Sequence, residues 1–531
     1  MLLDPLNSIL LATVLLTVFL LRRRSRLPLP PGPPKIPLLG NLFNHPSVSV
    51  WKVYMEWSKL YGKSNSDIIH VDIAGRSIII LSSLEAAVNL LDKRSAIYSD
   101  RSGSSPTKFP CSNQVPGFTD HACRWRTMVG ILHAELLCCI RRTRRRLFHT
   151  VFHAEASKKF LPRLLSPTHQ LLRRLLHEPE RFMAHLRHMT GIVIMGMAYG
   201  IGVVEKDDPY TRLAEDSFAS LTEGLVPGKF LVDSFPLLKY IPSWFPGAGL
   251  TFQRFARKGR MLSQNMLEKP FAEAKRKIAS GDAPYSFTAE SLQNLEEFPD
   301  KEQAIKETAA IMYSAGTDTI VSALGTFALA MLYNPEAQRR AQAEIDSVIK
   351  QGHLPDFDDE PYLPYVSALV REVLRWQPVT PLGVAHFIAV EDEYKGYRIP
   401  RGSTVMTNTW AILHDENLYP DPYAFKPERF LLNGKLNPAI QVPEAAAFGF
   451  GRRICPGRHM AASSIWITIT SILATFDIKK AVGKDGELVE PTYEYFERFI
   501  LMPQPFECSI KPRSKDAEAL IQSTADQDGT L

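Results

Sequence analysis

Apolar and polar residues recur along this chain with two periods, which fall in different regions. A helical period fits residues 50–61 and much of 154–277, with breaks at Pro162, Pro179, Pro209 and Val226-Pro227-Gly228. A period of two fits Ile68–Ile73 and Ser77–Leu81, and Ala74-Gly75-Arg76 joins these two runs as the turn of a predicted β-hairpin. The pattern predicts a mainly α protein with a small β region.

Three further helices are predicted in the second half of the chain. The longest pattern runs from Lys301 to Tyr333 and ends at Asn334-Pro335, because a proline disfavours helix at the residue before it. Another helix carries Glu372 and Arg375 and stops at Gln377-Pro378. An apolar run predicts the third, Ala461–Phe476.

Composition narrows the class of protein. The chain has 531 residues, of which 45% are hydrophobic and 22% charged, as in a globular protein with a large core. The net charge of +6 is mild and indicates no nucleic-acid partner. Six irregularly spaced cysteines favour a reducing compartment over a disulfide framework.

The N-terminal residues predict a membrane anchor. Ile9–Leu21 is apolar except for two threonines, and four arginines follow it at positions 22, 23, 24 and 26. Charge after the apolar stretch favours an uncleaved anchor with the rest of the chain cytoplasmic. A buried helix and a cleaved signal peptide are the alternatives, since the segment is short for a span of about 20 residues. We expect an anchor over 1–21 and a basic, proline-rich linker over 22–37 that acts as a stiff spacer.

A glycine-rich turn presents one cysteine. Its sequence is Phe448-Gly449-Phe450-Gly451-Arg452-Arg453-Ile454-Cys455-Pro456-Gly457. The glycines permit close backbone approach to a planar ligand, and the Cys455 thiolate can bind a metal. Pro456 has no N–H, so Gly457 is the expected donor to sulfur. The alternative is a buried structural cysteine.

The longest helix contains an unusual polar stretch, Ala315-Gly316-Thr317-Asp318-Thr319. A helical glycine costs about 1 kcal/mol relative to alanine, and Thr319 can bond back to a carbonyl of the preceding turn. One interpretation is a gap for a small ligand, beside a proton relay. The other is a packing notch against another helix.

These two stretches resemble the haem-ligand signature and the A-G-x-D-T pattern of the cytochrome P-450 superfamily. The resemblance implies a cytochrome P-450 fold over 38–512, with haem b (iron protoporphyrin IX) between the Lys301–Tyr333 helix and the Cys455 loop. Cys455 would be the axial iron ligand, and Phe448, Gly451 and Gly457 would shape the loop beside the haem.

The resemblance also implies roles for further residues. Arg453 would pair with a haem propionate, and Asp318 would relay solvent protons to Thr319. Glu372, Arg375 and Arg429 would form the structural ion-pair triad of the family. His386, on an expected strand edge, resembles another propionate contact, although a core or surface histidine is the alternative.

One segment departs from the family pattern. Trp125-Arg126 and Arg142–His149 resemble two halves of one helix, in which Trp125 and Arg145 would reach the propionates. The sixteen residues Thr127–Arg142 separate the halves. As helix they would move Arg145 from Trp125 by roughly 24 Å, which puts both contacts in doubt. Our hypothesis is that the segment is translated intron; otherwise it must loop out.

The implied function is a haem-thiolate monooxygenase of fungal secondary metabolism. It would insert one oxygen atom from dioxygen into an apolar small molecule: a terpenoid, steroid, polycyclic aromatic or indolic amine. NADPH electrons would arrive through a separate membrane-bound cytochrome reductase, at the endoplasmic reticulum membrane, with a single-pass anchor. A haem-thiolate isomerase or dehydratase and an inactive haem protein stay open. Residues 513–531 are expected to be a disordered tail.

Overall fold

A computed structural model describes residues 27–62, 67–100, 138–204, 208–224, 250–294 and 298–528. Contacts divide the chain into two compact units. The smaller unit comprises Met1–Ser102 and Ala385–Asn408, and the larger unit comprises Gly103–Val384 and Thr409–Leu531.

The smaller unit is built on a mixed four-stranded sheet of order β1-β2-β6-β3. Its elements are α2 (Val50–Tyr61), β1 (Ile68–Ile73), β2 (Arg76–Leu81), α3 (Leu84–Ala87), α4 (Ser95–Tyr98), β3 (His386–Phe387), β4 (Asp392–Tyr394), β5 (Tyr397–Ile399) and β6 (Thr404–Thr407).

The predicted hairpin and the predicted helix over 50–61 are confirmed. Ile69 of β1 pairs with Ile80 of β2, and both side chains are fully buried, which explains the β-branched apolar runs in both strands. Gly75, at φ 83°, makes the tight turn between them. Strand β6 then pairs in parallel with β2, and β3 pairs antiparallel with β6.

The described part of the proline-rich segment is docked on strands of this unit, an attachment that the prediction of a stiff spacer did not include. The carbonyl of Pro31 accepts from the His70 amide at 2.8 Å, and that of Pro28 accepts from the Arg398 amide at 2.8 Å. A Cβ at Gly32 would lie 2.1 Å from the His70 carbonyl oxygen. Proline segments are extended and leave their carbonyls free, so they can lie along a strand and accept its amides.

The larger unit is mainly helical. Its helices are α6 (Cys138–Phe152), α7 (Ala154–Ser157), α8 (Pro162–His177), α9 (Phe182–Tyr199), α10 (Pro209–Gly224), α12 (Leu250–Ser280), α13 (Phe287–Asn294), α14 (Lys301–Tyr333), α15 (Pro335–Val348), α16 (Pro364–Trp376), α17 (Thr409–Leu413), α18 (Glu444–Ala447), α19 (Arg458–Thr475) and α20 (Lys515–Asp528). Its strands are β7 (Leu431–Leu432), β8 (Lys435–Leu436), β9 (Phe476–Lys480), β10 (Tyr495–Glu497), β11 (Leu501–Pro503) and β12 (Cys508–Pro512).

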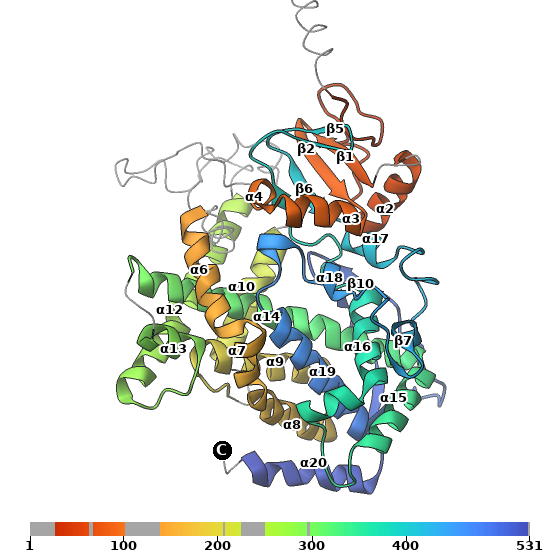
Figure 1. Ribbon diagram of the computed structural model, residues 1–531. Coiled ribbons are helices and arrows are strands. Elements are labelled where there is room, and N and C mark those ends of the chain that lie inside the picture. Colours follow the sequence, from red (N-terminus) through yellow and green to blue (C-terminus); the bar gives the residue numbers. More distant parts are fainter. Residues whose placement is uncertain are drawn as a thin grey trace, which may run out of the picture. The chain divides into compact units, whose positions relative to one another are not determined.

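Helix α14 lies in the middle of this unit, as Figure 1 shows, and packs against α9, α6 and α19. It has the predicted bounds and ends where Pro335 begins α15. Of the described helices, α14 alone is long and apolar enough to cross a membrane, but 78% of its most apolar window is buried inside the unit. It is therefore the core helix of the fold.

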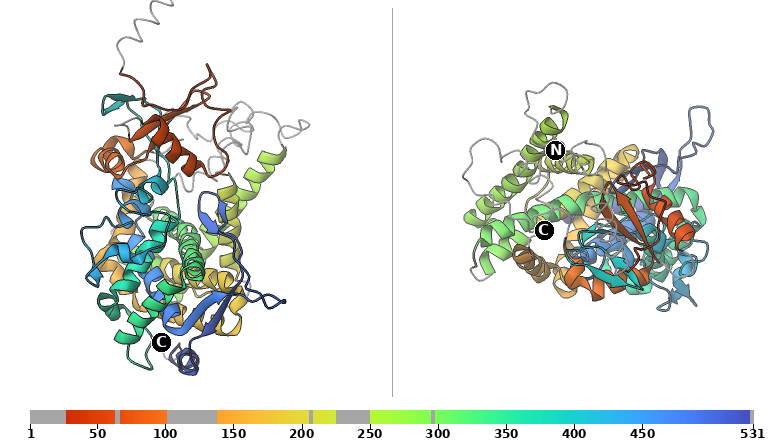
Figure 2. Two further views of the ribbon diagram at one scale, coloured as in Figure 1. Left: turned by 90° about the vertical axis from the view of Figure 1, so that its right-hand side faces the viewer. Right: turned by 90° about the horizontal axis from the view of Figure 1, so that it is seen from above.

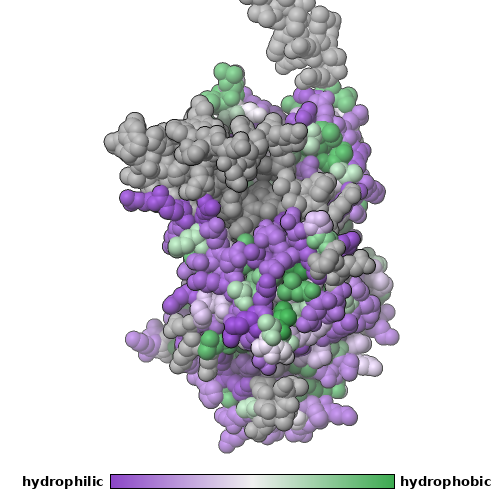
Figure 3. Space-filling model, turned by 90° about the vertical axis from the view of Figure 1, so that its left-hand side faces the viewer, coloured by the Kyte–Doolittle hydropathy of each residue, from purple (hydrophilic) through white to green (hydrophobic). Residues whose placement is uncertain are grey.

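The surface helices are amphipathic by contrast. Helices α10 and α12 pack against each other, and the views in Figure 2 show them together at one side of the unit. Figure 3 draws the side on which α12 and α13 lie, where hydrophilic residues form most of the surface that is not grey. This distribution is typical of helices that bury a single face.

The C-terminal segment corrects two predictions. The apolar helix after the cysteine loop covers Arg458–Thr475, and Phe476 already belongs to β9, which pairs with β12. Lys515–Asp528 forms helix α20, so the expectation of a disordered tail is wrong there. Ile521 is fully buried, and Arg173 of α8 donates to the Thr524 hydroxyl at 2.5 Å. These contacts order a helix that shows little periodicity in sequence.

Candidate active site

The cysteine loop is a tight turn between α18 and α19. The Cys455 amide donates to the Phe448 carbonyl at 2.7 Å, which closes the loop on itself. Cys455 is half-buried and forms no disulfide within the described residues. Phe450, within the loop, is buried. Cys455 is therefore held on a fixed backbone and stays partly exposed.

Two of its glycines have backbone conformations that other residues rarely adopt. Gly449 has φ 75° and Gly451 has φ 53°, whereas Gly457, at φ −85°, does not need to be glycine for this reason. The expectation that Gly457 points its amide at sulfur stays a prediction.

Arg145 reaches this loop from helix α6. Its Nη2 donates to the carbonyl of Ile454, directly before Cys455, at 2.6 Å. The neighbouring Arg144 is buried and forms an ion pair with Glu307 of α14. Two arginines in sequence thus fix α6 against both the cysteine loop and the core helix.

The segment Thr127–Arg142 is only partly visible. Trp125 and residues 127–137 lie outside the described residues, while Cys138–Arg142 form the first turns of α6. Arg145 lies at the cysteine loop, whereas its separation from Trp125 stays a prediction because Trp125 is outside the described residues. Whether the segment belongs to the mature protein stays a prediction that sequencing of the transcript will test.

Helix α14 carries the polar stretch Ala315–Thr319. Gly316 faces α9, because a Cβ there would lie 2.7 Å from Cδ1 of Ile194. This close approach supports the interpretation of Gly316 as a packing notch against α9. Ala315, one residue earlier, is exposed although Tyr313 and Ile320 are buried, and Thr319 is half-buried one turn later. The Thr319 hydroxyl donates to the Ala315 carbonyl at 2.9 Å.

Asp318 is held by a second helix. Nη2 of Arg187, on α9, lies 3.5 Å from its carboxylate, and Nε of the same arginine lies 3.4 Å from the Glu215 carboxylate of α10. Burial raises the pKa of Asp318, and Arg187 opposes that rise. Burial also raises the pKa of Glu215. A carboxyl with a raised pKa can carry a proton closer to neutral pH.

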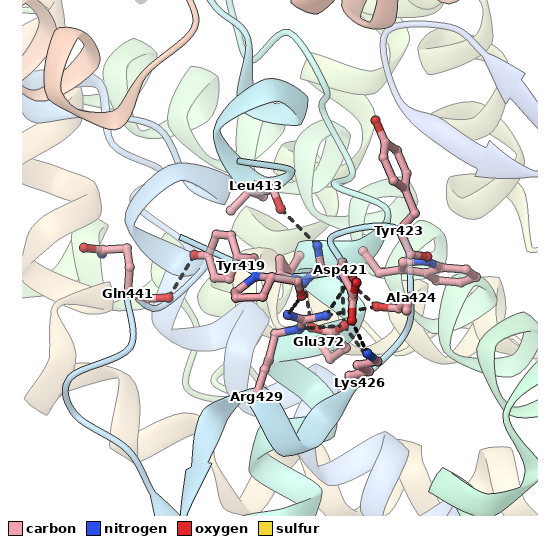
Figure 4. Close-up of polar contacts among 12 residues, drawn as sticks. Glu372, Leu413, Tyr419, Asp421, Tyr423, Ala424, Lys426, Arg429 and Gln441 are labelled. Carbon is pink, nitrogen blue, oxygen red and sulfur yellow. Dashed lines mark hydrogen bonds and ion pairs between the residues drawn. The ribbon is translucent and has the colours of Figure 1, made fainter. Parts of the chain in front are cut away.

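The three triad residues are brought together as predicted. Figure 4 shows this network. Arg375 Nε lies 2.7 Å and Arg429 Nε 3.1 Å from the Glu372 carboxylate. Arg375 also donates to the carbonyl of Leu413 at 3.0 Å, and the Lys426 amide donates to Glu372 at 2.8 Å. The network joins α16 to the segments on both sides of residue 420, well inside the protein.

His386 belongs to the smaller unit. It lies in β3, is buried, and its Nδ1 is 2.7 Å from the carbonyl oxygen of Tyr98. The predicted strand position is confirmed. Its role toward a propionate stays a prediction.

The larger unit's residues fit a haem. Cys455 is partly exposed and offers a soft sulfur ligand, and Arg145 and Arg453 offer cations for two propionates. Phe448 and Ile454 add apolar side chains to the same loop. The helix α19 that starts after this loop packs on α14, and so does α6. A partly exposed cysteine on a closed loop, with arginines in and beside that loop, fits the chemistry of a haem-thiolate site.

The cytochrome P450 family model matches residues 30–509, so the chain belongs to the cytochrome P450 family and is an oxidoreductase of the monooxygenase class. Cytochrome P450 monooxygenase 98 of Postia placenta is 43% identical over 95% of this chain and 94% of its own. Cytochrome P450 monooxygenase ple1 of Rhodocybe pseudopiperita is 41% identical over 94% and 93%. Tryptamine 4-monooxygenase of Psilocybe cyanescens is 37% identical over 93% and 94%.

Sequence reasoning missed Arg187, Glu215 and Glu307. Each makes its ion pair between two helices: Arg187 pairs with Asp318 and with Glu215, and Glu307 pairs with Arg144. Charged residues on amphipathic helices are usually solvated, so the sequence held no signal that distinguished these three.

Proposed function

We propose that this chain inserts one oxygen atom from dioxygen into an apolar small molecule, with electrons from NADPH. The observation that carries the proposal is the partly exposed Cys455 on its closed loop, with Arg145 at the adjoining carbonyl. When bound, the haem supplies an iron that activates dioxygen, and the cysteine thiolate supplies electron density to it. Trp125, Arg145, Arg453 and His386 are the proposed propionate contacts.

Proton delivery would fall to two residues of α14. Asp318 has a raised pKa and a side chain that is only 15% exposed, so it can hold a proton beside Thr319 on α14. Thr319 lies one residue on, and its hydroxyl can pass that proton inward when it leaves the Ala315 carbonyl. This relay favours a monooxygenase over an isomerase or dehydratase, which needs no proton delivery.

The electron donor is proposed to be a membrane-bound NADPH cytochrome reductase that docks beside the cysteine loop. Exposed cations occur on α6, on the turn after α7 and in the loop itself: Arg146, Lys158, Lys159 and Arg452. An acidic partner surface would complement them and speed the encounter. We place the protein at the endoplasmic reticulum membrane, anchored by residues 1–21, with the catalytic unit in the cytoplasm.

The substrate class is the least constrained part of the proposed function. The relatives include a tryptamine 4-monooxygenase, so tryptamine belongs in the test panel beside sesquiterpenoids, steroids and polycyclic aromatics.

The test uses microsomes that contain the full chain and a reductase, supplied with NADPH and ¹⁸O₂. Incorporation of a single ¹⁸O into a panel compound supports the proposal. Conversion that needs neither NADPH nor dioxygen would identify an isomerase or dehydratase instead. Absence of a thiolate-type spectrum would identify an inactive haem protein.

A further inference from the structure

Three charged side chains meet where helices α9, α10 and α14 come together. Arg187 of α9 lies between two carboxylates, because its Nη2 is 3.5 Å from Asp318 of α14 and its Nε is 3.4 Å from Glu215 of α10. Since two carboxylates share one guanidinium, the group has a net negative charge when both are ionised and is neutral when it holds one proton. The proposed relay uses Asp318 and leaves Glu215 without a role.

The packing of α9 against α10 holds this group together. A Cβ at Gly191 would lie 3.3 Å from Oγ1 of Thr211, so α10 approaches α9 closely at this point. Arg187 lies one turn before Gly191, and Glu215 lies one turn after Thr211. Positions four apart share a helix face, so the same packed faces that bring Gly191 to Thr211 bring Arg187 to Glu215.

The two carboxyls differ in their access to solvent. The Glu215 side chain is 44% exposed, whereas that of Asp318 is 15% exposed. Glu215 can therefore exchange protons with bulk water directly, while Asp318 is the more enclosed of the two and is followed in sequence by Thr319. The order of exposure gives the group an outer carboxyl and an inner one.

Hydroxyl groups at the same junction provide a place for water. Oη of Tyr313 and Oγ1 of Thr211 are buried and face each other, and neither makes a hydrogen bond of ordinary length within the described residues. Buried hydroxyls are usually satisfied by protein or by ordered water, so these two indicate water at the junction. Burial raises the pKa of Tyr313, and the charges of Glu215 and Asp318 raise it further, so this ring lies near both carboxylates.

The charges around Glu215 come from all three helices. Burial raises the pKa of Glu215, Arg187 from α9 opposes that rise, and Asp318 from α14 adds to it. On α10 itself, Asp216 raises the pKa of Glu215 and Arg212 lowers it. The net effect is a raised pKa, so the protonated form of Glu215 persists closer to neutral pH than that of an ordinary glutamate.

We propose that Glu215 loads the proton that Asp318 delivers. The Glu215 carboxylate takes a proton from bulk water, and a bridging water passes it to the Asp318 carboxylate. Arg187 is a positioning residue that holds the two carboxyls and keeps its own proton throughout. One proton leaves the solvent for each proton that Asp318 gives to Thr319, so the charge of the group is restored after each transfer. This inference rests on the proposed relay through Asp318 and Thr319.

The first measurement is an infrared pH titration of the haem-loaded full chain, which needs no substrate. The carbonyl stretch of a protonated carboxyl is separate from the bands of carboxylates, and the difference between wild type and Glu215→Gln isolates this carboxyl. Between pH 4 and pH 8 we expect that difference to contain a protonated-carboxyl band with a midpoint above 4.5, the ordinary value for glutamate. Asp216→Asn, which removes the exposed neighbouring carboxylate, should retain the band. A midpoint at or below 4.5 would overturn the proposal.

The second measurement follows product formed per NADPH, with the full chain, its reductase and the compound that incorporates ¹⁸O. Glu215→Gln should lower this ratio by about 3-fold to 10-fold, less than the loss of a direct proton donor, because water still reaches Asp318 slowly. The wild-type ratio should fall as pH rises from 6 to 9, since Glu215 then loses its proton. In Glu215→Gln the ratio should be low throughout, with most of the pH dependence lost. Glu215→Asp should restore both, and Asp216→Asn should match wild type.

Asp318→Asn separates this inference from the relay on which it rests. A low ratio in Asp318→Asn beside a wild-type ratio in Glu215→Gln would overturn the role of Glu215 alone. Wild-type ratios in both variants would overturn the relay and the inference together. A low ratio in Glu215→Gln that Glu215→Asp does not restore would assign the ion pair to packing and also overturn the proposal. The reduced CO spectrum checks that each variant carries an intact thiolate-ligated haem.

Discussion

The hydroxyl of Thr319 is the smallest group on which the proposed chemistry depends. It bonds to the Ala315 carbonyl at 2.9 Å and lies on the open side of α14, one residue from a carboxyl whose pKa burial raises. Gly316, by contrast, serves packing against Ile194. The polar stretch that looked like one motif in the sequence thus divides between structure and chemistry.

We predict that Thr319→Ala binds haem normally but loses proton delivery. Product formed per NADPH should fall by about 10-fold to 100-fold, near the lower end for a positioned proton donor, and hydrogen peroxide should account for the difference. NADPH loss and peroxide are measured together. Thr319→Ser keeps the hydroxyl and should stay close to wild type; unchanged coupling in Thr319→Ala would assign Thr319 to packing.

At the scale of elements, one buried ion network holds α16 to the segment around Arg429. Glu372 and Arg375 are fully buried, so loss of the carboxylate would leave two guanidinium groups without their counter-charge. We predict that Glu372→Gln lowers the free energy of unfolding by about 3–5 kcal/mol. Denaturant unfolding and the yield of haem-loaded protein measure this.

The matched control is Glu336→Gln, which breaks an exposed pair with Arg339 on α15. Exposed pairs contribute about 0–1 kcal/mol, so this variant should unfold like wild type. Equal effects of the two changes would show that the triad is not the stabilising element.

Helix α20 lies where the sequence analysis expected disorder, and its packing can be tested. Ile521 packs into the core with no exposed surface, so Ile521→Ala should cost about 2–5 kcal/mol. Gln522→Ala, at the exposed neighbouring position, should change stability by less than about 0.5 kcal/mol. Denaturant midpoints compare the two. Identical midpoints for the two variants would support the earlier expectation that this tail is disordered.

The docked proline segment carries a pH-sensitive contact. Burial, with a further contribution from the nearby Lys35 cation, lowers the pKa of His70 to about 4. Nδ1 of His70 contacts the Lys35 ammonium and Nε2 lies 2.9 Å from the Ser77 hydroxyl, so a second ring proton would face a cation. Because the folded pKa lies below the unfolded value of 6.5, this stability is present near neutral pH and is lost as pH falls toward 4.

We predict that acidification from pH 7 to pH 4 removes about 3 kcal/mol through His70. Protection of the His70 and Gly40 amides against hydrogen exchange should fall over that range, since these amides hold the segment in place. In His70→Asn the pH dependence of this protection should largely disappear. A wild type whose protection is flat down to pH 4 would contradict the lowered pKa.

At the scale of the whole molecule, the sequence predicted elements whose signals are local. Helix α14 and its end at Asn334 follow from apolar periodicity and a proline, and the β1–β2 hairpin follows from alternation around Gly75. The cysteine loop was readable because its residues are contiguous. Among contacts between distant segments, the Glu372–Arg429 pair was expected only through the family resemblance. The bond from the Asp72 amide to Asn41, the Asp318–Arg187 pair and the packing of helix α20 were not readable.

The central claim is that Cys455 supplies a thiolate to haem iron, and the CO spectrum of the reduced protein tests it most directly. Wild type should give the strongly red-shifted Soret band of a thiolate-ligated haem, and Cys455→Ser should lose it, because a serine hydroxyl stays neutral. Cys508→Ser is the control, since burial raises the pKa of that thiol to about 12 and keeps it protonated. A red-shifted band that persists in Cys455→Ser, or its absence from wild type, would contradict the account.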